Sequence, residues 1–242
     1  MCIRDREREN ADTLAYLTSL PVDGWTAQYE QVQISGDKLE SYVGEEYYAA
    51  PAGIWYLPEG VTNRKYLIRR EADGALTLWK FTSFEMKAGE TYTYADVLSV
   101  IYGVDSAEDI VQITTSPFKA NMTPEGIAIQ NEIGTHTYTD RETISQIYEI
   151  VKDIVCYGAG EEYPEDDTRF SYSFSTEKKD KLTSGESTYG TRCIRIEFTD
   201  GTVLDSWKYS ALSGSFFEYG GIFTQPLEAK DVEALNKIFQ IQ

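Results

Sequence analysis

Two Asp-Gly dipeptides, Asp73-Gly74 and Asp200-Gly201, constrain the fold of this chain more than any other feature. Each dipeptide lies between segments in which apolar and polar residues alternate, a pattern that buries one face of a β-strand. Asp and Gly tolerate the positive φ that tight hairpin turns require, so the flanking segments are predicted to pair antiparallel. The sequence therefore predicts antiparallel β-meanders, with strands at 65–70 and 75–81 around the first turn.

Further elements are predicted on either side of these hairpins. Helical spacing of apolar residues predicts helices over residues 7–20, 140–155 and 232–239. Thr93 and Asp96 have the spacing of a capping box, which predicts the start of a further helix. Strands are predicted at 39–48 and 53–57, and Pro21 is predicted to end the first helix. The fold class predicted is α+β, with helices covering antiparallel meanders.

The two hairpins agree beyond their turns, which indicates an internal repeat. Ile68-Arg69-x-Glu71 precedes the first turn and Trp79-Lys80-Phe81 follows it. Ile194-Arg195-x-Glu197 and Trp207-Lys208-Tyr209 hold the corresponding places around the second turn. This match predicts a tandem duplication of a unit made of a helix, a four-strand meander and a helix. The alternative is coincidence, because Asp-Gly turns and strand tryptophans are common.

The domain organisation predicted is two α+β lobes, 7–104 and 105–242, after an N-terminal hexapeptide that is not native. Residues 1–6 read Met-Cys-Ile-Arg-Asp-Arg, the translation of a DNA sequence that resembles the transposase end used in sequencing libraries. We expect the hexapeptide to be an adapter artefact and exclude it from the fold argument. An anchor or signal peptide upstream of the recorded start is expected to be missing.

Charge and motif content exclude several classes of function. Lys and Arg number 22 against 40 Asp and Glu, a net charge of −18, and such an acidic surface repels nucleic-acid phosphates and anionic lipid. The chain has one histidine, His136, so a multi-histidine metal site cannot form. No Walker loop, dinucleotide fingerprint, Cys-x-x-Cys or nucleophile elbow is present. Nucleic acid, membrane insertion, metal and cofactor are therefore not expected.

Two local features have competing interpretations. The acidic loop 161–167 offers clustered carboxylates for Ca²⁺, but it lacks the order of an EF-hand and is more simply a solvated loop. Cys156 and Cys193 lie close enough in the predicted fold to form a disulfide, although two buried free thiols are the favoured interpretation.

The candidate binding surface comes from the aromatic residues, because Tyr and Trp provide large, stiff, amphipathic contact area. A meander covered by helices on one face leaves its other face open. Core filling is the alternative, since strands select aromatic residues in any case. The candidate residues are Trp55, Tyr56, Trp79, Trp207, Tyr209 and Tyr219.

The C-terminal part also carries a resemblance. The segments 106–110, 134–140 and 198–204 are similar to extracytoplasmic domains of lipoproteins and membrane-tethered regulators of Gram-positive anaerobes. The resemblance implies an extracytoplasmic location and transfers no catalytic residue. We therefore expect a non-catalytic binding or sensing module with a protein or cell-wall glycan ligand. The alternatives are a secreted carbohydrate-active enzyme with an Asp/Glu pair and an inhibitor-like interaction module.

Overall fold

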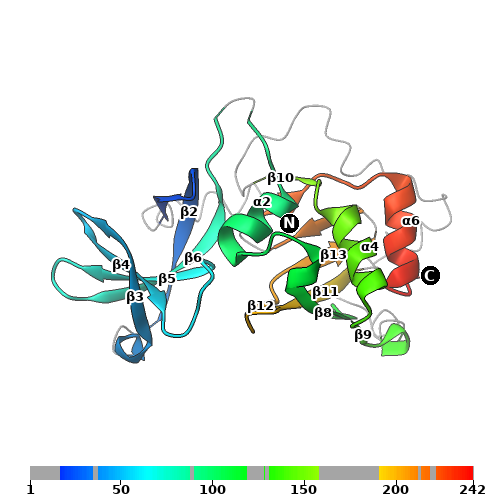
Figure 1. Cartoon of the computed structure of the whole chain (residues 1–242), viewed down its shortest axis with the longest axis horizontal. Helices are drawn as coiled ribbons and strands as arrows, with labels where there is room; N and C mark the ends of the chain where they lie inside the picture. Colours follow the sequence, from blue (N-terminus) through cyan, green and yellow to red (C-terminus); the bar gives the residue numbers. More distant parts are fainter. Residues whose placement is uncertain are drawn as a thin grey trace. The chain divides into compact units, whose positions relative to one another are not determined.

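The protein divides into two units, each built on one antiparallel sheet (Figure 1). The computed structural model describes residues 17–34, 38–87, 90–118, 128, 131–157, 191–211, 214–218 and 222–241. The N-terminal unit comprises Met1–Glu90 with Val100–Tyr102, and the C-terminal unit comprises Thr91–Ser99 with Gly103–Gln242. The chain is mainly antiparallel β with few short helices, so the predicted α+β class overstated its helix.

The sheet of the N-terminal unit has six strands in the order β1-β2-β6-β5-β4-β3, and each neighbouring pair is antiparallel. The Asp73-Gly74 turn joins β5 to β6, as its sequence predicts. The strands are β1 (Leu17–Val22), β2 (Trp25–Val32), β3 (Val43–Ala50), β4 (Gly53–Pro58), β5 (Tyr66–Glu71) and β6 (Leu76–Phe84).

This sheet curves strongly, which gives it a concave and a convex side. The ring of Tyr29 on β2 lies 6.4 Å from that of Trp55 on β4, although β6 and β5 separate these strands in the sheet order. Leu67 and Phe81 lie on the same side and are buried. The Tyr29 hydroxyl donates a hydrogen bond to the Arg64 carbonyl oxygen, and burial raises the pKa of that hydroxyl. The aromatic core of the unit therefore fills the concave side.

The convex side is only partly covered. After β2 the chain leads to a 3₁₀ turn, Glu40–Tyr42, in front of β3. Leu39, at the start of this turn, packs on Ile68 and Leu76, and Glu40 pairs with Arg70 at 2.9 Å. Val43, Tyr56 and Leu78 are partly buried against this cluster.

The helix predicted over residues 7–20 is wrong at its C-terminal end. Residues 17–22 form β1, in which Leu20 and Val22 are buried while Leu17 is 45% exposed. The Asp23-Gly24 turn pairs this segment with β2, and such tertiary pairing overrides a weak helical pattern. Pro21, predicted to end a helix, lies inside this edge strand; residues 7–16 are outside the described residues.

The C-terminal unit is built on a nine-stranded antiparallel sheet whose main path runs β7-β10-β15-β14-β13-β11-β8-β9, with β12 paired to β11. None of the helices described is long and apolar enough to span a membrane. The strands are β7 (Tyr92–Thr93), β8 (Ile110–Pro117), β9 (His136–Tyr138), β10 (Val155–Tyr157), β11 (Thr191–Phe198), β12 (Val203–Leu204), β13 (Lys208–Ser210), β14 (Ser215–Phe217) and β15 (Phe223–Thr224).

The first short helix begins at its predicted signal. The capping box at Thr93 and Asp96 starts α2 (Tyr94–Val97), which continues into a π-helical turn, Leu98–Tyr102, ended by the left-handed Gly103. A 3₁₀ turn, Ala107–Asp109, precedes β8.

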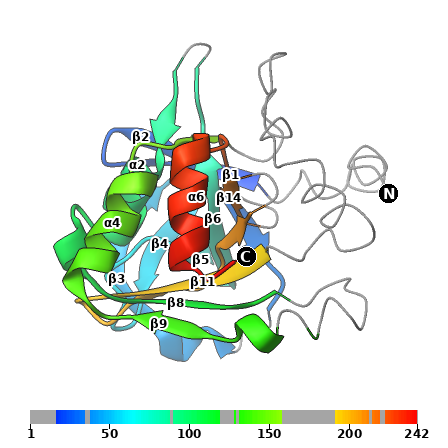
Figure 2. The ribbon, with the colours of Figure 1, turned by 90° about the vertical axis from the view of Figure 1, so that its right-hand side faces the viewer.

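Two longer helices, α4 (Arg141–Val151) and α6 (Ala229–Ile238), contact each other and lie side by side over the sheet (Figure 2). The predicted helix over 140–155 is confirmed only as far as Val151, and its cap is Asp140, whose carboxylate accepts from the Thr143 N–H. Val155 instead enters β10, where it pairs with Thr93.

The Asp-Gly turns of the two hairpins match closely. Gly74 donates to the Glu71 carbonyl and Gly201 to the Phe198 carbonyl, and each Asp carboxylate accepts from the N–H two residues on. The strand order around the hairpins differs. The return strand β6 neighbours β2, which precedes the hairpin in the chain, whereas β13 neighbours β14, which follows it. The described residues therefore do not show the predicted helix and four-strand duplication, and the similarity is limited to the hairpins.

We predict that Ile147→Ala destabilises the protein by about 2–5 kcal/mol, because Ile147 is 5% exposed on the inner side of α4 and the smaller side chain leaves a cavity. Urea unfolding followed by circular dichroism measures this change in the free energy of unfolding. The control, Glu149→Ala, removes a side chain that is 58% exposed on the same helix and should change stability by less than about 0.5 kcal/mol. Equal effects of the two substitutions would contradict the packing of α4.

Candidate functional site

The Arg-x-Glu motif shared by the hairpins forms an ion pair in both. Arg69 Nη2 lies 2.8 Å from Glu71 Oε2, and Arg195 Nη1 lies 3.2 Å from Glu197 Oε2. Residues two apart on a strand point to the same face, so the motif places both charges side by side. The settings differ, because the Arg69 side chain is 16% exposed and that of Arg195 is 47% exposed. Only the first pair lies in a packed environment.

Arg69 packs against two tryptophans. Its guanidinium carbon lies 5.4 Å from the Trp55 ring centroid and 5.9 Å from that of Trp79, and the two indole systems are 5.4 Å apart at 61°. Cation–π attraction strengthens where the cation is removed from water, as it is here. The guanidinium is thereby held on the concave side of the sheet.

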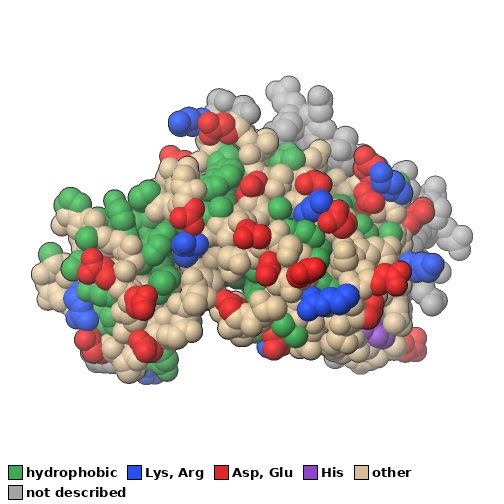
Figure 3. Space-filling view, in the orientation of Figure 1, with side chains coloured by type: hydrophobic (Ala, Val, Ile, Leu, Met, Phe, Trp, Pro, Cys, Tyr) green, Lys and Arg blue, Asp and Glu red, His purple; other side chains and the backbone are tan. Residues whose placement is uncertain are grey.

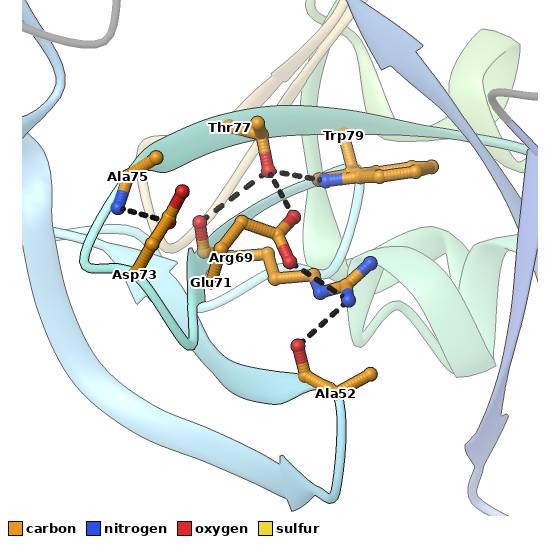
Figure 4. Close-up of polar contacts among 7 residues, drawn as sticks. All are labelled: Ala52, Arg69, Glu71, Asp73, Ala75, Thr77 and Trp79. Atoms are coloured by element: carbon orange, nitrogen blue, oxygen red, sulfur yellow. Dashed lines mark hydrogen bonds and ion pairs between the residues drawn. The ribbon is translucent and has the colours of Figure 1, made fainter.

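Polar contacts complete this cluster, which consists of Arg69, Glu71, Thr77 and Trp79 with the Ala52 carbonyl (Figure 4). Arg69 Nη2 also donates to the Ala52 carbonyl oxygen at 2.8 Å, and Trp79 Nε1 donates to Thr77 Oγ1 at 2.8 Å. Arg69 Nε is buried without a hydrogen-bond partner. The Arg69 guanidinium, the Glu71 carboxylate and the Trp79 indole N–H all bond to groups within the protein. The cluster is therefore suited to holding the β5–β6 hairpin on the sheet.

The glycine beside Arg69 is needed for this arrangement. A Cβ at Gly53 would lie 2.5 Å from the Arg70 carbonyl oxygen and 3.0 Å from Arg69 Nε, and its φ is +152°. No L side chain fits there without moving the strand or the guanidinium. Gly53 therefore allows the close approach of β4 to β5.

A second candidate surface lies on the open part of the convex side. One cross-strand row joins Glu30, Lys80 and Tyr66, because Lys80 is the register partner of both other residues. Val32 and Leu78 form the adjacent pair on β2 and β6. We call these five residues the open face. Of the five, Tyr66 is exposed, the other four are partly buried, and Leu78 also packs against the Leu39 cluster. Tyr66 is 38% exposed, and hydrophobic side chains reach the surface over the N-terminal unit in the space-filling view (Figure 3).

Most of the predicted binding residues are core residues instead. Trp55 and Trp79 are 2% and 5% exposed, and Tyr56 is partly buried against the Leu39 cluster. Trp207 and Tyr209 are 1% and 0% exposed in the C-terminal unit. This burial is what the alternative of core filling predicts for these side chains.

In the C-terminal unit, the face of the sheet on which each side chain lies explains its burial. Tyr209 lies on the helix-covered face, where its hydroxyl donates to Asn236 Oδ1 at 2.9 Å and its ring lies 5.4 Å from that of Phe239. Trp207 packs 4.7 Å from Tyr94 between ring centroids. Tyr219 lies outside the described residues.

The remaining sequence candidates do not come together as a site. Within the described residues no cluster of His, Cys, Asp and Glu could hold a metal ion, and the acidic loop 161–167 lies outside them. His136 contacts the Ile133 carbonyl oxygen through Nε2 and Gln240 through Nδ1. Neither Cys156 nor Cys193 forms a disulfide, and burial raises the pKa of the Cys193 thiol.

In comparisons with known proteins, no family model, no curated protein and no solved structure matched the chain. Sequence reasoning missed Arg69 and Tyr66. The signal for Arg69 was its place in the alternation, on the same side of β5 as Leu67 and opposite Trp55 on β4.

We predict that Arg69→Ala costs about 1–3 kcal/mol of stability, because it removes two cation–π contacts and leaves Glu71 without its cation. Tryptophan fluorescence should also change, since the guanidinium covers both indoles. Thermal and urea unfolding monitored at the tryptophan emission maximum measure both effects. The matched control is Arg195→Ala, whose exposed ion pair should contribute less than about 0.5 kcal/mol. Equal losses from the two arginines would rule out the packed role of Arg69.

Gly53→Ala is expected to destabilise the protein more than Gly60→Ala does, by about 1–3 kcal/mol. Both glycines have positive φ, of +152° and +72°, but a Cβ at Gly60 meets nothing within 4 Å. The comparison separates steric conflict with Arg69 and Arg70 from backbone strain alone. Differential scanning calorimetry of the two variants measures it, and a similar melting temperature for both would contradict the close approach at Gly53.

Proposed function

We propose that this protein is a non-catalytic extracytoplasmic binding or sensing module, and that its ligand contacts the open face of the six-stranded sheet. The observation that carries the proposal is the row Glu30, Lys80 and Tyr66, which combines a cation, an anion and a 38% exposed aromatic ring on adjacent strands. Aromatic rings beside charged groups are typical of surfaces that bind proteins and glycans. The extracytoplasmic location rests on the sequence resemblance alone.

The chemistry of the open face favours a protein or a cell-wall glycan as the ligand. Tyr66 offers stacking area, while Lys80 and Glu30 place charges of opposite sign within one register row. Val32 and Leu78 add an apolar strip beside that row. A secreted carbohydrate-active enzyme with an Asp/Glu pair and an inhibitor-like interaction module are the competing functions.

The proposal predicts that Tyr66→Ala weakens binding to an immobilised ligand by about tenfold or more, as expected for a central aromatic contact. The probes are a glycan array and purified insoluble peptidoglycan, with affinity measured by biolayer interferometry and by co-sedimentation. Tyr42→Ala is the control, because Tyr42 is 58% exposed but lies in the 3₁₀ turn rather than on the open face. Its effect should stay within about twofold.

The same samples are assayed for hydrolysis of the glycans, which separates binding from catalysis. The proposal expects no released product. Product release that a single Asp→Asn or Glu→Gln substitution abolishes would establish the glycosidase alternative. Equal loss of binding in both tyrosine variants would instead show that the open face is not the contact surface.

A further inference from the structure

One row of side chains on the convex side of the N-terminal sheet crosses four strands. Its members are successive register partners on β1, β2, β6 and β5, namely Leu17, Glu30, Lys80 and Tyr66. Directly paired residues of antiparallel strands point to the same face, so Leu17 extends the open face onto β1. Leu17 is 45% exposed and Tyr66 is 38% exposed. The row therefore has an acid and a base at its centre and an exposed aliphatic or aromatic side chain at each end.

This order of residues is complementary to itself. Consider a two-fold axis that lies between two such faces and runs along the strands, midway between β2 and β6. It brings Glu30 of each copy opposite Lys80 of the other, and it brings Val32 of each copy opposite Leu78 of the other. The rotation also keeps the strands of the two sheets aligned, as in packed β-sandwiches. Opposite charges and apolar pairs thus meet, as a symmetric interface requires.

The charge of this face differs from that of the chain as a whole. The chain has 22 Lys and Arg against 40 Asp and Glu, so two copies repel each other on average. The open face and Leu17 together contain one acid and one base, Glu30 and Lys80, and are neutral. At physiological salt the other charges are screened beyond about 8 Å, which permits contact at a neutral face.

The curvature of the sheet limits the area of such a contact. Two convex sides meet along a strip over β2 and β6 rather than across all the strands of the sheet. Standard interfaces bury about 800 Å² from each partner, and a strip two strands wide, with strands about 4.8 Å apart, offers less. We therefore expect weak, reversible association that is half complete at about 0.1–1 mM protein.

We propose that the open face binds a second copy of this chain in a weak two-fold dimer, in which Glu30 of each copy faces Lys80 of the other. The inference rests on the proposed function, because it uses the same face and names its protein partner. The aliphatic side chains favour this partner over a glycan. Leu17, Val32 and Leu78 offer no ring on which a sugar could stack, and Tyr66 is the one aromatic ring of the row.

The test exchanges the two charges and measures self-association of the full chain by sedimentation equilibrium, from about 10 μM to about 1 mM protein in about 0.15 M salt. Glu30→Lys and Lys80→Glu each put like charges opposite each other, and each should weaken association by about tenfold or more. Glu30→Lys also lowers the net negative charge, so relief of general repulsion would have the opposite effect. An equimolar mixture of the two variants should associate like the wild type, because the charges of one variant then face opposite charges on the other.

Two further variants control for folding and for net charge. The double variant Glu30→Lys/Lys80→Glu restores both opposite-charge pairs across the axis and should associate like the wild type. Circular dichroism of the single variants checks that they are folded. Glu149→Lys makes the same change in net charge at a position that is 58% exposed on α4, and it should not weaken association.

Three results would overturn the proposal. One is a wild type that stays monomeric over the whole concentration range, and another is a dimer that the folded single variants form as readily as the wild type. The third is a mixture of the two single variants that does not associate. A monomeric wild type whose glycan or peptidoglycan binding is lost in Tyr66→Ala would assign the face to a glycan. That result would overturn the dimer and leave the proposed function intact, so the two failures are distinguishable.

Discussion

The curvature of the six-stranded sheet is the constraint on which the N-terminal unit depends. Strands that curve round a concave side bring β2 and β4 together across two intervening strands, and the contact between Tyr29 and Trp55 records that approach. Once β5 and β6 pair through the Asp73-Gly74 turn, the two-residue period decides which side chains enter the concave side. Arg69 and Trp79 face inward, whereas Tyr66 and Lys80 face outward. The core and the open face are thus two results of one register.

The two hairpins show how far a local motif determines structure. Both Asp-Gly turns form the same bonds, and both Arg-x-Glu motifs form an ion pair. The surroundings then decide what the pair does. Arg69 meets two indoles across neighbouring strands, while Arg195 remains largely in solvent. A packed guanidinium contributes to stability where an exposed one contributes little, because water screens the second. The similarity in sequence therefore reflects a common turn chemistry more securely than a duplicated unit.

Local signals predicted the hairpins, the strands next to the Asp73-Gly74 turn and the capping box at Thr93, because each depends on residues close in sequence. The helix predicted over 7–20 was wrong in its last turn, since Leu20 and Val22 fit the inward positions of a strand once Asp23-Gly24 pairs it with β2.

The candidate site was less predictable than the fold. Trp207 and Tyr209 were chosen by residue type, and type does not reveal which face of a sheet the helices cover. Arg69 was missed because its role depends on Trp55, which belongs to another strand.

The difference between the two sheet edges follows from the same geometry. A two-residue turn fixes which neighbouring pair carries the ladder bonds, so the next residue along the edge must direct its backbone outward. Proline at that place in β1 costs no ladder bond and removes a donor that could recruit another strand, which explains why a residue with low β-propensity is tolerated there. Alanine holds the corresponding place in β3 and keeps its N–H, but exposed Glu45 and Glu46 and two register irregularities precede it on that strand. The two edges are therefore guarded by different devices, a proline in β1 and charge with an irregular register in β3.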